Sequence, residues 1–314
     1  MCLIEGFPIC FSIFEKAYIY IASLGLRLLG SSVFFIFKGH ERMKVVAVAN
    51  QKGGVGKTTS VVNIACRLAS SGVRVLVVDM DPQANATSCF SSLVSEQGFK
   101  EKLCFSAGVY EVITGNADCL SAMVPINGKL SYLAAAGDLA AAELELVSMF
   151  DRESQLKYGL ETLKGKVDYV IIDTPPTLGL LTVNALTASD SVLVPLQTEY
   201  YALEGLSQLL KTIEVIKRRL NPGLCLEGIF LTMFDRRNNL SKQVEENVRT
   251  HFGDVVYKTL VPRNVRLSEA PSHGESIFHY APKSSGACAY SQLVDEFLAL
   301  QPKIISNEEG AVHV

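Results

Sequence analysis

The sequence predicts an α/β protein with a doubly wound, mostly parallel sheet. Two observations lead to this prediction. Short, nearly continuous runs of Val, Ile and Leu recur along the chain, and longer segments with helical spacing lie between them. Continuous apolar runs are typical of parallel strands that helices cover on both faces. Alternating strands and helices then favour a doubly wound sheet, in which ligands bind at the carboxyl ends of the strands.

Five apolar runs are predicted to be strands, and six segments are predicted to be helices. The expected strands are residues 44–50, 73–79, 167–173, 190–196 and 226–234. The expected helices are residues 57–71, 138–163, 178–188, 203–220, 240–251 and 286–300. Together they predict one domain over residues 43–301, followed by a polar tail over residues 302–314.

The composition restricts the classes of function. The 314 residues are 48% hydrophobic and carry a formal net charge of −3. This balance excludes a globally basic surface for nucleic acid, so any such binding would need a local patch. None of the eight cysteines forms a Cys-x-x-Cys pair, which favours reduced thiols in a cytosolic protein over a metal or disulfide framework.

Residues 1–42 differ from the rest because they contain a long apolar stretch, residues 17–37. The stretch is long enough to span a bilayer, but Arg27 near its middle opposes insertion. Glu5 and Glu15 oppose a signal peptide. Met43 directly precedes the first expected strand, so the preferred interpretation of residues 1–42 is translation from an upstream start codon. A membrane anchor and another packed or disordered extension are the alternatives.

The first expected strand leads into the sequence NQKGGVGKTTS, residues 50–60. Gly53, Gly54 and Gly56 allow the backbone around Val55 to turn its N–H groups toward phosphate oxygens. The helix expected to follow adds the positive end of its dipole. The strand, loop and helix together therefore predict a phosphate-binding loop.

The side chains of this loop follow the usual phosphate-loop pattern only in part. In that pattern, Lys57 would contact the β- and γ-phosphates and the Thr58 hydroxyl would bind Mg²⁺, while Thr59 is suited to the α-phosphate. The first glycine of the pattern is replaced by Gln51, and the loop carries a second lysine, Lys52. Lys52 lies five residues before Lys57, on the other limb of the loop, so it is poorly placed for the γ-phosphate of its own nucleotide.

Carboxylates follow two other expected strands. Asp79 and Asp81, in DMDPQAN, are two residues apart, so an extended chain would point both toward the phosphates. One could hold a Mg²⁺-bound water and the other could orient an attacking water. Asp173 ends VDYVIID and matches the acidic residue that holds Mg²⁺ through water, and residues 174–176 then form an expected γ-phosphate switch. Ordinary turn and cap carboxylates are the less favoured alternative.

Three segments, KGGVGKTT, DMDPQANAT and YVIIDTPPTLGLLTVNAL, resemble the ParA/Soj chromosome- and plasmid-partitioning ATPases. These are P-loop NTPases of the deviant Walker A superfamily, which also contains MinD. The resemblance covers about residues 43–300. It extends to VPLQTEYYALEGLSQLL, LTMFDRRNNLS and VPRNVRLSEAPSHGESI, which are similar to Soj-type ParA and not to MinD. The short chromosomal type is expected, because no helix-turn-helix segment is recognised before the loop.

The resemblance implies a Mg²⁺-dependent ATPase that forms an ATP-sandwich homodimer, binds DNA non-specifically and acts in chromosome or plasmid partitioning. It implies a ParB-like stimulating partner and a cytoplasmic, nucleoid-associated location. Lys52 would reach across the dimer to the phosphates of the other copy, so Lys52, Lys57 and Asp81 are the expected catalytic residues. Asp81 would orient water, and Asp79 would act on Mg²⁺ indirectly, with Thr58 and Asp173 as the other metal residues.

Two further sets of residues depend mostly on the resemblance. The adenine pocket of the family maps onto Met233, Pro262 and Asn264. Arginines in the C-terminal half would meet DNA phosphates in a sequence-independent and salt-sensitive way, although ordinary solvated faces explain them nearly as well. The expected DNA-binding residues are Arg218, Arg219, Arg236, Arg237 and Arg266.

Two alternative functions share the same loop. The first is a MinD-like membrane-cycling ATPase, which is disfavoured because residues 291–314 are acidic and lack a basic amphipathic face. A membrane partner is therefore not expected unless residues 17–37 are translated and inserted. The second is an ATP-dependent metabolic enzyme on the same scaffold, for which the sequence reveals no substrate pocket.

Overall fold

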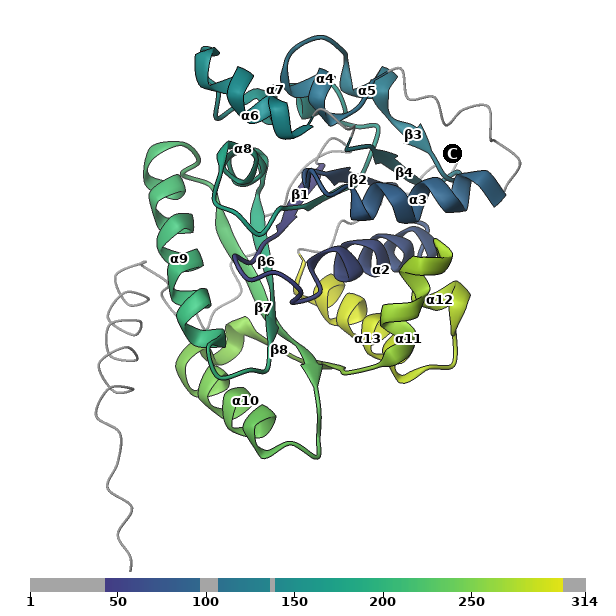
Figure 1. The fold of residues 1–314 in the computed structure, drawn as a ribbon, viewed down its shortest axis with the longest axis vertical. Coiled ribbons are helices and arrows are strands. Elements are labelled where there is room, and N and C mark those ends of the chain that lie inside the picture. Colours follow the sequence, from purple (N-terminus) through teal and green to yellow (C-terminus); the bar gives the residue numbers. More distant parts are fainter. Residues whose placement is uncertain (1–42, 97–106, 136–138, 302–314) are drawn as a thin grey trace, which may run out of the picture.

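The computed structural model describes residues 43–96, 107–135 and 139–301. Eight strands of this part of the chain form one sheet in the order β3-β4-β2-β5-β1-β6-β7-β8, and Figure 1 shows it as a twisted layer between helices. Neighbouring strands run parallel at every pairing except β3 with β4. The predicted α/β class with a doubly wound, mostly parallel sheet is confirmed.

The five expected strands form close to their predicted bounds. They are β1 (Lys44–Val48), β2 (Val75–Asp79), β5 (Tyr169–Asp173), β6 (Ser191–Gln197) and β7 (Cys225–Phe234). Three further strands were not predicted, namely β3 (Val124–Pro125), β4 (Leu130–Leu133) and β8 (Val256–Pro262). β3 and β4 are very short, and β8 is an edge strand whose apolar run is interrupted by the exposed Lys258.

Five of the six expected helices also form near their predicted bounds: α2 (Lys57–Ser70), α8 (Leu180–Ala188), α9 (Ala202–Arg219), α10 (Asn239–Phe252) and α13 (Ser285–Leu300). The helix expected over residues 138–163 is instead divided into α6 (Leu139–Ser148) and α7 (Gln155–Glu161). Asp151 lies between them with a φ of 48°, a left-handed conformation that a right-handed helix cannot contain. Five further α-helices of the described residues were not predicted, namely α3 (Asn85–Glu96), α4 (Val109–Ile113), α5 (Cys119–Ala122), α11 (Val265–Glu269) and α12 (Ile277–Tyr280).

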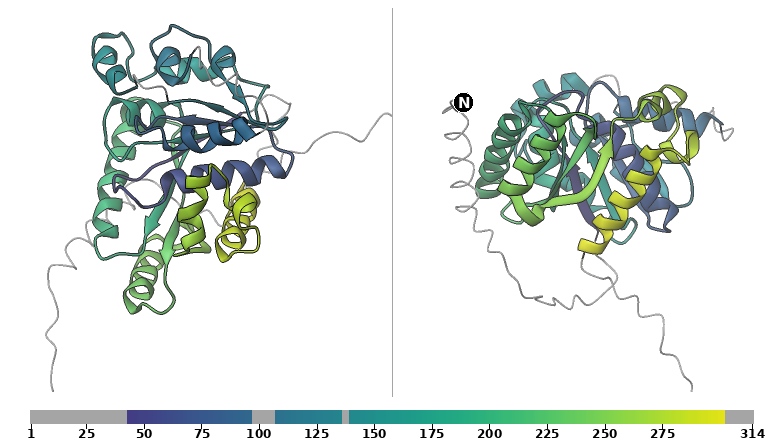
Figure 2. Two further views of the ribbon diagram at one scale, coloured as in Figure 1. Left: turned by 45° about the vertical axis from the view of Figure 1, so that its right-hand side comes forward. Right: turned by 90° about the horizontal axis from the view of Figure 1, so that it is seen from below.

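Helices cover both faces of the sheet. Alternate residues of β1 point to opposite faces: Val46 and Val48 pack in one buried cluster with α2 and α13, and Val45 and Ala47 pack in another with α8 and α9. Figures 1 and 2 show the two pairs of helices on opposite sides of the sheet. Burial on both faces explains why the central strands are continuous apolar runs.

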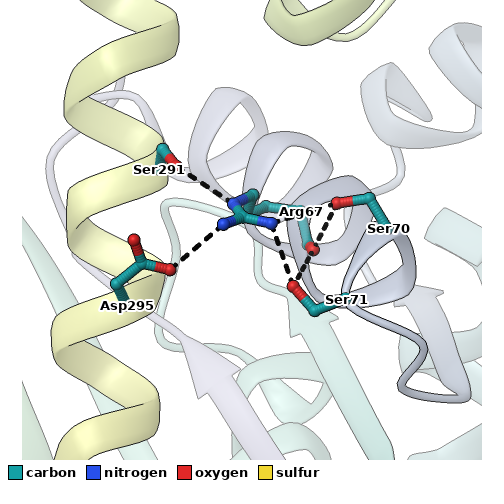
Figure 3. Close-up of polar contacts among 5 residues, drawn as sticks. All are labelled: Arg67, Ser70, Ser71, Ser291 and Asp295. Carbon is teal, nitrogen blue, oxygen red and sulfur yellow. Dashed lines mark hydrogen bonds and ion pairs between the residues drawn. The ribbon is translucent and has the colours of Figure 1, made fainter.

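Polar contacts fix α13 against α2, the helix that begins at the glycine-rich loop. The Arg67 side chain of α2 donates to the Ser291 hydroxyl at 3.1 Å and to the Asp295 carboxylate at 3.2 Å, as Figure 3 shows. Nearer the loop, the hydroxyls of Ser60 and Tyr290 are 2.8 Å apart within the core. These contacts hold α2, and therefore the loop at its start, in a fixed position.

The predictions for residues 1–42 and for the tail, residues 302–314, fall outside the described residues. Within the part that is described, we find no helix with the length and apolar character needed to cross a membrane.

Candidate functional site

The loop between β1 and α2 has the backbone conformation that its glycines predict. Gly54 and Gly56 have φ values of 74° and 91°, a region that glycine adopts without strain. Gly56 is also the N-cap of α2, where the first N–H groups of a helix lack intrahelical partners. Thr58 and Thr59 are half-buried in the first turn of α2, and Gly53 is exposed in the loop. This arrangement suits an anion at the helix N-terminus.

Two neighbouring strands hold the loop in place. The Asn50 side chain donates to the carbonyl of Pro195 in β6 at 2.8 Å. The Thr232 hydroxyl of β7 donates to the carbonyl of Val55, which is buried, at 2.9 Å. Sequence reasoning missed Asn50 and Thr232; the available signal for Thr232 is a polar residue within the apolar run of residues 228–234. These two contacts limit how far the loop can move.

Lys57 is almost fully buried behind this loop. Its side chain is largely enclosed, with 7% of the residue exposed, and its ammonium donates to the Lys52 carbonyl at 3.1 Å. Burial lowers the pKa of Lys57, while the charges of Asp173 and Asp81 oppose that shift. The ammonium therefore lies in a site with little water, where an anion would interact with it strongly.

Asp79 and Asp173 lie side by side at the carboxyl ends of β2 and β5. They are register partners in the parallel pairing of these strands, and the Met80 N–H beyond β2 donates to the Asp173 carbonyl at 3.0 Å. Asp173 is also the register partner of Val48, the last residue of β1 before the loop. Sheet pairing thus places Asp173 beside the glycine-rich loop.

The Asp173 carboxylate is fully buried, and neither of its oxygens accepts a hydrogen bond from the described residues. Burial raises the pKa of Asp173 well above its usual range, and the charge of Asp79 adds to this. The Thr58 hydroxyl and the Lys57 ammonium favour the charged form but do not complete a hydrogen bond to it. A buried carboxylate without a donor is costly, and a cation would relieve that cost.

A nucleotide-bound Mg²⁺ fits this donor set. No group of three or more His, Cys, Asp or Glu residues in the described ranges could hold a metal alone. Mg²⁺ in nucleotide sites needs only one or two protein oxygens, because phosphates and water supply the rest. The orphaned Asp173 carboxylate and the nearby Thr58 hydroxyl supply such oxygens.

Replacing Asp173 with asparagine is expected to stabilise the metal-free protein at pH 8, because a neutral amide costs less to bury than a carboxylate whose charge has no hydrogen-bond partner. A buried polar group without a partner costs about 1–3 kcal/mol, and more when it is charged. The folded-state pKa of Asp173 lies above its unfolded value, so the parent protein loses stability as pH rises from the unfolded pKa through the folded pKa. The advantage of Asp173→Asn should therefore grow between pH 5 and pH 8. Urea unfolding at both pH values measures it.

Asp168→Asn is a control with the opposite sign. Burial raises the pKa of Asp168, but the Arg74 guanidinium, 2.6 Å from the carboxylate, outweighs burial and lowers it. The stability that Asp168 contributes is present above its unfolded pKa and lost as pH falls through its folded pKa. Asp168→Asn should therefore destabilise the protein at pH 8. If Asp173→Asn also loses stability at pH 8, the claim that the buried Asp173 carboxylate is uncompensated is wrong.

Asp79 is tied to the beginning of α3. Its carboxylate accepts hydrogen bonds from the Thr87 N–H and hydroxyl, both at 2.7 Å, and from the Asp81 N–H at 3.1 Å. Burial raises the pKa of Asp79 to about 6 in spite of these bonds, which lower it. Thr87, which sequence reasoning missed, also accepts from the Ala135 N–H beyond β4 at 2.8 Å. Both Asp79 oxygens have protein partners, so an indirect role at the metal stays a prediction.

Asp81 follows β2 by two residues and is nearly buried, at 7% exposed. It lies in a turn, where its carboxylate accepts from the Gln83 N–H at 3.0 Å. Its charge acts on Lys57 and on Asp173, so it belongs to the same cluster. The role of Asp81 in orienting water stays a prediction.

The Lys52 side chain has its ion-pair partner outside that cluster. Its ammonium forms an ion pair with Glu199, which lies beyond the end of β6, and Gln197 donates to the same carboxylate. The Lys52 N–H donates to the Asn50 side chain at 3.0 Å. The side chains of Lys52 and Glu199 are 38% and 48% exposed. Glu199 was not predicted from the sequence.

The three residues predicted to contact a base lie at the carboxyl ends of β7 and β8. Pro262 lines a hollow of about 820 Å³ between these strands and α13, and Phe234, the neighbour of Met233, lines it too. Met233 has a φ of 52°, which is uncommon for a residue with a side chain. The Asn264 side chain caps α11, accepting from the Arg266 N–H at 2.8 Å, and donates to the Ser285 hydroxyl at 2.7 Å. Both polar atoms of the Asn264 side-chain amide are thus already hydrogen-bonded within the protein.

The five arginines predicted to bind DNA do not form one patch. Helix α9 starts beyond the carboxyl end of β6 and ends before the first residue of β7. Arg218 and Arg219, at its last turn, therefore lie toward the amino ends of the strands (Figures 1 and 2). Arg236 and Arg237 follow the carboxyl end of β7, and Arg266 lies in α11 beyond β8. The structure thus divides the expected patch between opposite ends of the sheet.

Three of these arginines are paired with carboxylates of their own chain. The ion pairs are Arg218 with Glu214 at 2.6 Å, Arg237 with Asp235 at 3.3 Å and Arg266 with Glu269 at 2.8 Å. The side chains of Arg237 and Arg266 are 92% and 59% exposed. Exposed ion pairs contribute little, so a phosphate could displace these carboxylates.

Comparison with known proteins gives relatives along most of the chain. The model of a family described as AAA domain matches residues 43–226. The sporulation initiation inhibitor protein Soj of Bacillus subtilis (strain 168) is 51% identical over 257 residues, which cover 82% of this chain and 98% of that protein. The chromosome partitioning protein ParA of Myxococcus xanthus (strain DK1622) is 48% identical over 256 residues, covering 81% and 88%.

A solved structure is similar over a comparable share of the chain. It is described as cobyrinic acid a,c-diamide synthase from Mycobacterium smegmatis with bound ADP and magnesium. Its sequence is 38% identical, the TM-score is 0.69, and the match covers 82% of this chain and 94% of that one.

Proposed function

Because the chain belongs to the ParA/Soj family of chromosome-partitioning ATPases, we propose that it hydrolyses ATP with Mg²⁺ as a nucleotide-sandwich homodimer on DNA. The observation that carries this proposal is the buried cluster of Lys57, Asp81 and Asp173 beside the glycine-rich loop. The proposed location is the cytoplasm, on the nucleoid. A ParB-like protein is the proposed stimulating partner.

The proposed hydrolysis site uses one set of residues for binding and another for reaction. The loop N–H groups and Lys57 bind the phosphates, and Thr58 and Asp173 hold Mg²⁺, with Asp79 fixing the adjoining turn. Bound Mg²⁺ would neutralise charge on the β- and γ-phosphates. Asp81 orients the water that attacks the γ-phosphorus while the bond to ADP breaks. Lys52 of the other copy supplies positive charge in trans, a device known to accelerate phosphoryl transfer.

DNA binding is proposed for the arginines at the carboxyl ends of β7 and β8. Arg236, Arg237 and Arg263 line the hollow between β7, β8 and α13, and Arg266 directly follows Val265, which also lines it, so the four residues belong to one region. Arg218 and Arg219 belong to the opposite end of the sheet and can contact a duplex only on a separate face. We therefore propose that Arg236, Arg237, Arg263 and Arg266 bind DNA. Arg218 and Arg219 serve for comparison.

Reversing charge at Arg236 and Arg237 together is expected to weaken ATP-dependent binding to all DNA sequences alike. The slope of log affinity against log salt should fall by about one unit per lost phosphate contact. ATP turnover without DNA should stay near normal, because the glycine-rich loop and Lys57 hold the phosphates and these arginines do not. DNA retention at several salt concentrations, with and without ATP, measures the effect beside basal turnover.

The matched control is the double reversal of Arg218 and Arg219, which changes the charge equally at the other end of the sheet. This control should retain DNA as the parent does. The assignment is wrong if the two double variants lose DNA equally, or if only the control loses it. Loss of basal turnover in the Arg236/Arg237 variant would instead assign these arginines to the nucleotide or the dimer.

A second candidate function is an ATP-dependent metabolic enzyme. The observation that favours it is the description of the 38% identical structure as a diamide synthase. Such an enzyme would turn over ATP only with its small-molecule substrate. ATP turnover by the purified protein alone, and its stimulation by DNA, supports the partitioning ATPase; absence of both supports the metabolic enzyme.

A further inference from the structure

The Lys52–Glu199 ion pair joins two loops that follow neighbouring strands. Lys52 lies in the loop after β1, and Glu199 lies two residues after the end of β6. The Asn50 side chain, which accepts from the Lys52 N–H, itself donates to Pro195 of β6. The backbone of the loop after β1 is therefore tied to β6. The Lys52 and Glu199 side chains meet between these two connected segments.

Glu199 is itself held in position. Its N–H donates to the Gln197 carbonyl at 2.8 Å, and its carboxylate accepts from the Gln197 side-chain amide as well as from Lys52. The carboxylate thus faces the loop while the Lys57 ammonium behind that loop contacts the Lys52 carbonyl. Lys52 therefore makes two contacts. Its backbone carbonyl accepts from the Lys57 ammonium, and its own ammonium is paired with Glu199.

We propose that Glu199 is a positioning residue that holds Lys52 within its own subunit until a second copy docks. This inference rests on the proposed function, in which Lys52 acts on the nucleotide of the other copy. In forming the dimer, the Lys52 ammonium exchanges the Glu199 carboxylate for phosphate oxygens of that nucleotide. Glu199 thereby sets the protein concentration at which the ATP-bound dimer forms.

The exposure of the pair determines the size of this effect. With side chains 38% and 48% exposed, the pair belongs to the class of surface ion pairs, which change an equilibrium by at most about fivefold. A two-fold symmetric dimer releases one pair in each subunit, so the dimerisation constant changes by up to about 25-fold. A contact of this strength delays dimer formation without preventing it.

The test compares Glu199→Gln with the parent protein. Glu204→Gln is the matched control, because Glu204 is exposed in the first turn of α9 and its change removes the same charge nearby. Sedimentation with a slowly hydrolysed ATP analogue should show the Glu199→Gln dimer at a lower protein concentration than the parent, by a factor of up to about 25. The control should dimerise as the parent does. ATP affinity under dilute, monomeric conditions should be the same in all three.

A second measurement does not depend on the dimer. In the nucleotide-free monomer, an amine-reactive reagent followed by mass spectrometry should label Lys52 several-fold faster in Glu199→Gln than in the parent or the control. Equal labelling of Lys52 in all three proteins overturns the inference. So does a Glu199→Gln protein that dimerises at the same concentration as a parent that does dimerise.

The two measurements separate this inference from the proposed function. A parent that never dimerises with ATP contradicts the trans role of Lys52, whatever the labelling shows. A parent that dimerises normally, with no effect of Glu199→Gln, leaves the trans role intact and removes Glu199 from it.

Discussion

Replacing Lys57 with alanine is expected to weaken the binding of Mg²⁺-ATP by roughly a hundredfold or more. Lys57 is the buried cation of the loop, beside the carboxylates of Asp81 and Asp173. Removing one partner of a buried charge–charge contact between a protein and its ligand weakens binding by about 2–5 kcal/mol. Triphosphate would then approach two carboxylates with no ammonium between them.

Titration with a fluorescent ATP analogue in the presence of Mg²⁺ measures this loss. Circular dichroism and thermal unfolding establish that the variant is folded, and Lys57→Gln offers a second neutral side chain of similar length if alanine destabilises the protein. An exposed lysine, Lys242 of α10, is the control for loss of one positive charge. Parent-like affinity in a folded Lys57 variant would contradict the site assignment.

The fold was predictable where burial alone decides the structure. Strands β1, β2, β5 and β6 are buried over most of their length, so their sequences are continuous apolar runs. β8 is the edge of the sheet and exposes Lys258, so its pattern is not that of a buried strand. The break between α6 and α7 depends on the backbone of a single residue, Asp151, and helical spacing on either side conceals it.

The candidate site was predictable to the extent that each residue ends a strand or belongs to the loop. Lys57, Thr58 and Asp173 come together because β1 and β5 are adjacent and parallel. Asn50 and Thr232 were not predicted because they act on partners 145 and 177 residues away. Such contacts depend on which strands become neighbours, and the order of strands is not visible in any local pattern.

The arginines show a second limit of sequence reasoning. Arg219 and Arg236 are close in the chain, but β7 runs between them and carries the chain from one end of the sheet to the other. At about 3.3 Å per residue, a strand of ten residues separates them by roughly 30 Å. Clustering along the sequence therefore does not imply clustering in space.

Replacing Lys52 with alanine is expected to leave ATP binding by the monomer within a few-fold of normal and to reduce ATP hydrolysis by roughly a thousandfold. The Lys52 ammonium is paired with Glu199, outside the cluster around Lys57, so its loss should affect monomeric binding little. A cation supplied in trans accelerates phosphoryl transfer by about 10³-fold or more. Single-turnover hydrolysis with labelled ATP measures the rate, and Lys242→Ala is again the control.

Mixing two inactive variants distinguishes action in trans from action in cis. Lys52→Ala keeps Asp81, and Asp81→Ala keeps Lys52. In a mixed dimer, the Lys52 side chain of the Asp81→Ala subunit would reach the nucleotide of the Lys52→Ala subunit, where Asp81 is intact. One complete site in each mixed dimer, with half of the dimers mixed, gives about a quarter of the parent rate. If Lys52 acted on its own nucleotide, no subunit of any dimer would hold both residues, and the mixture would stay as inactive as its components.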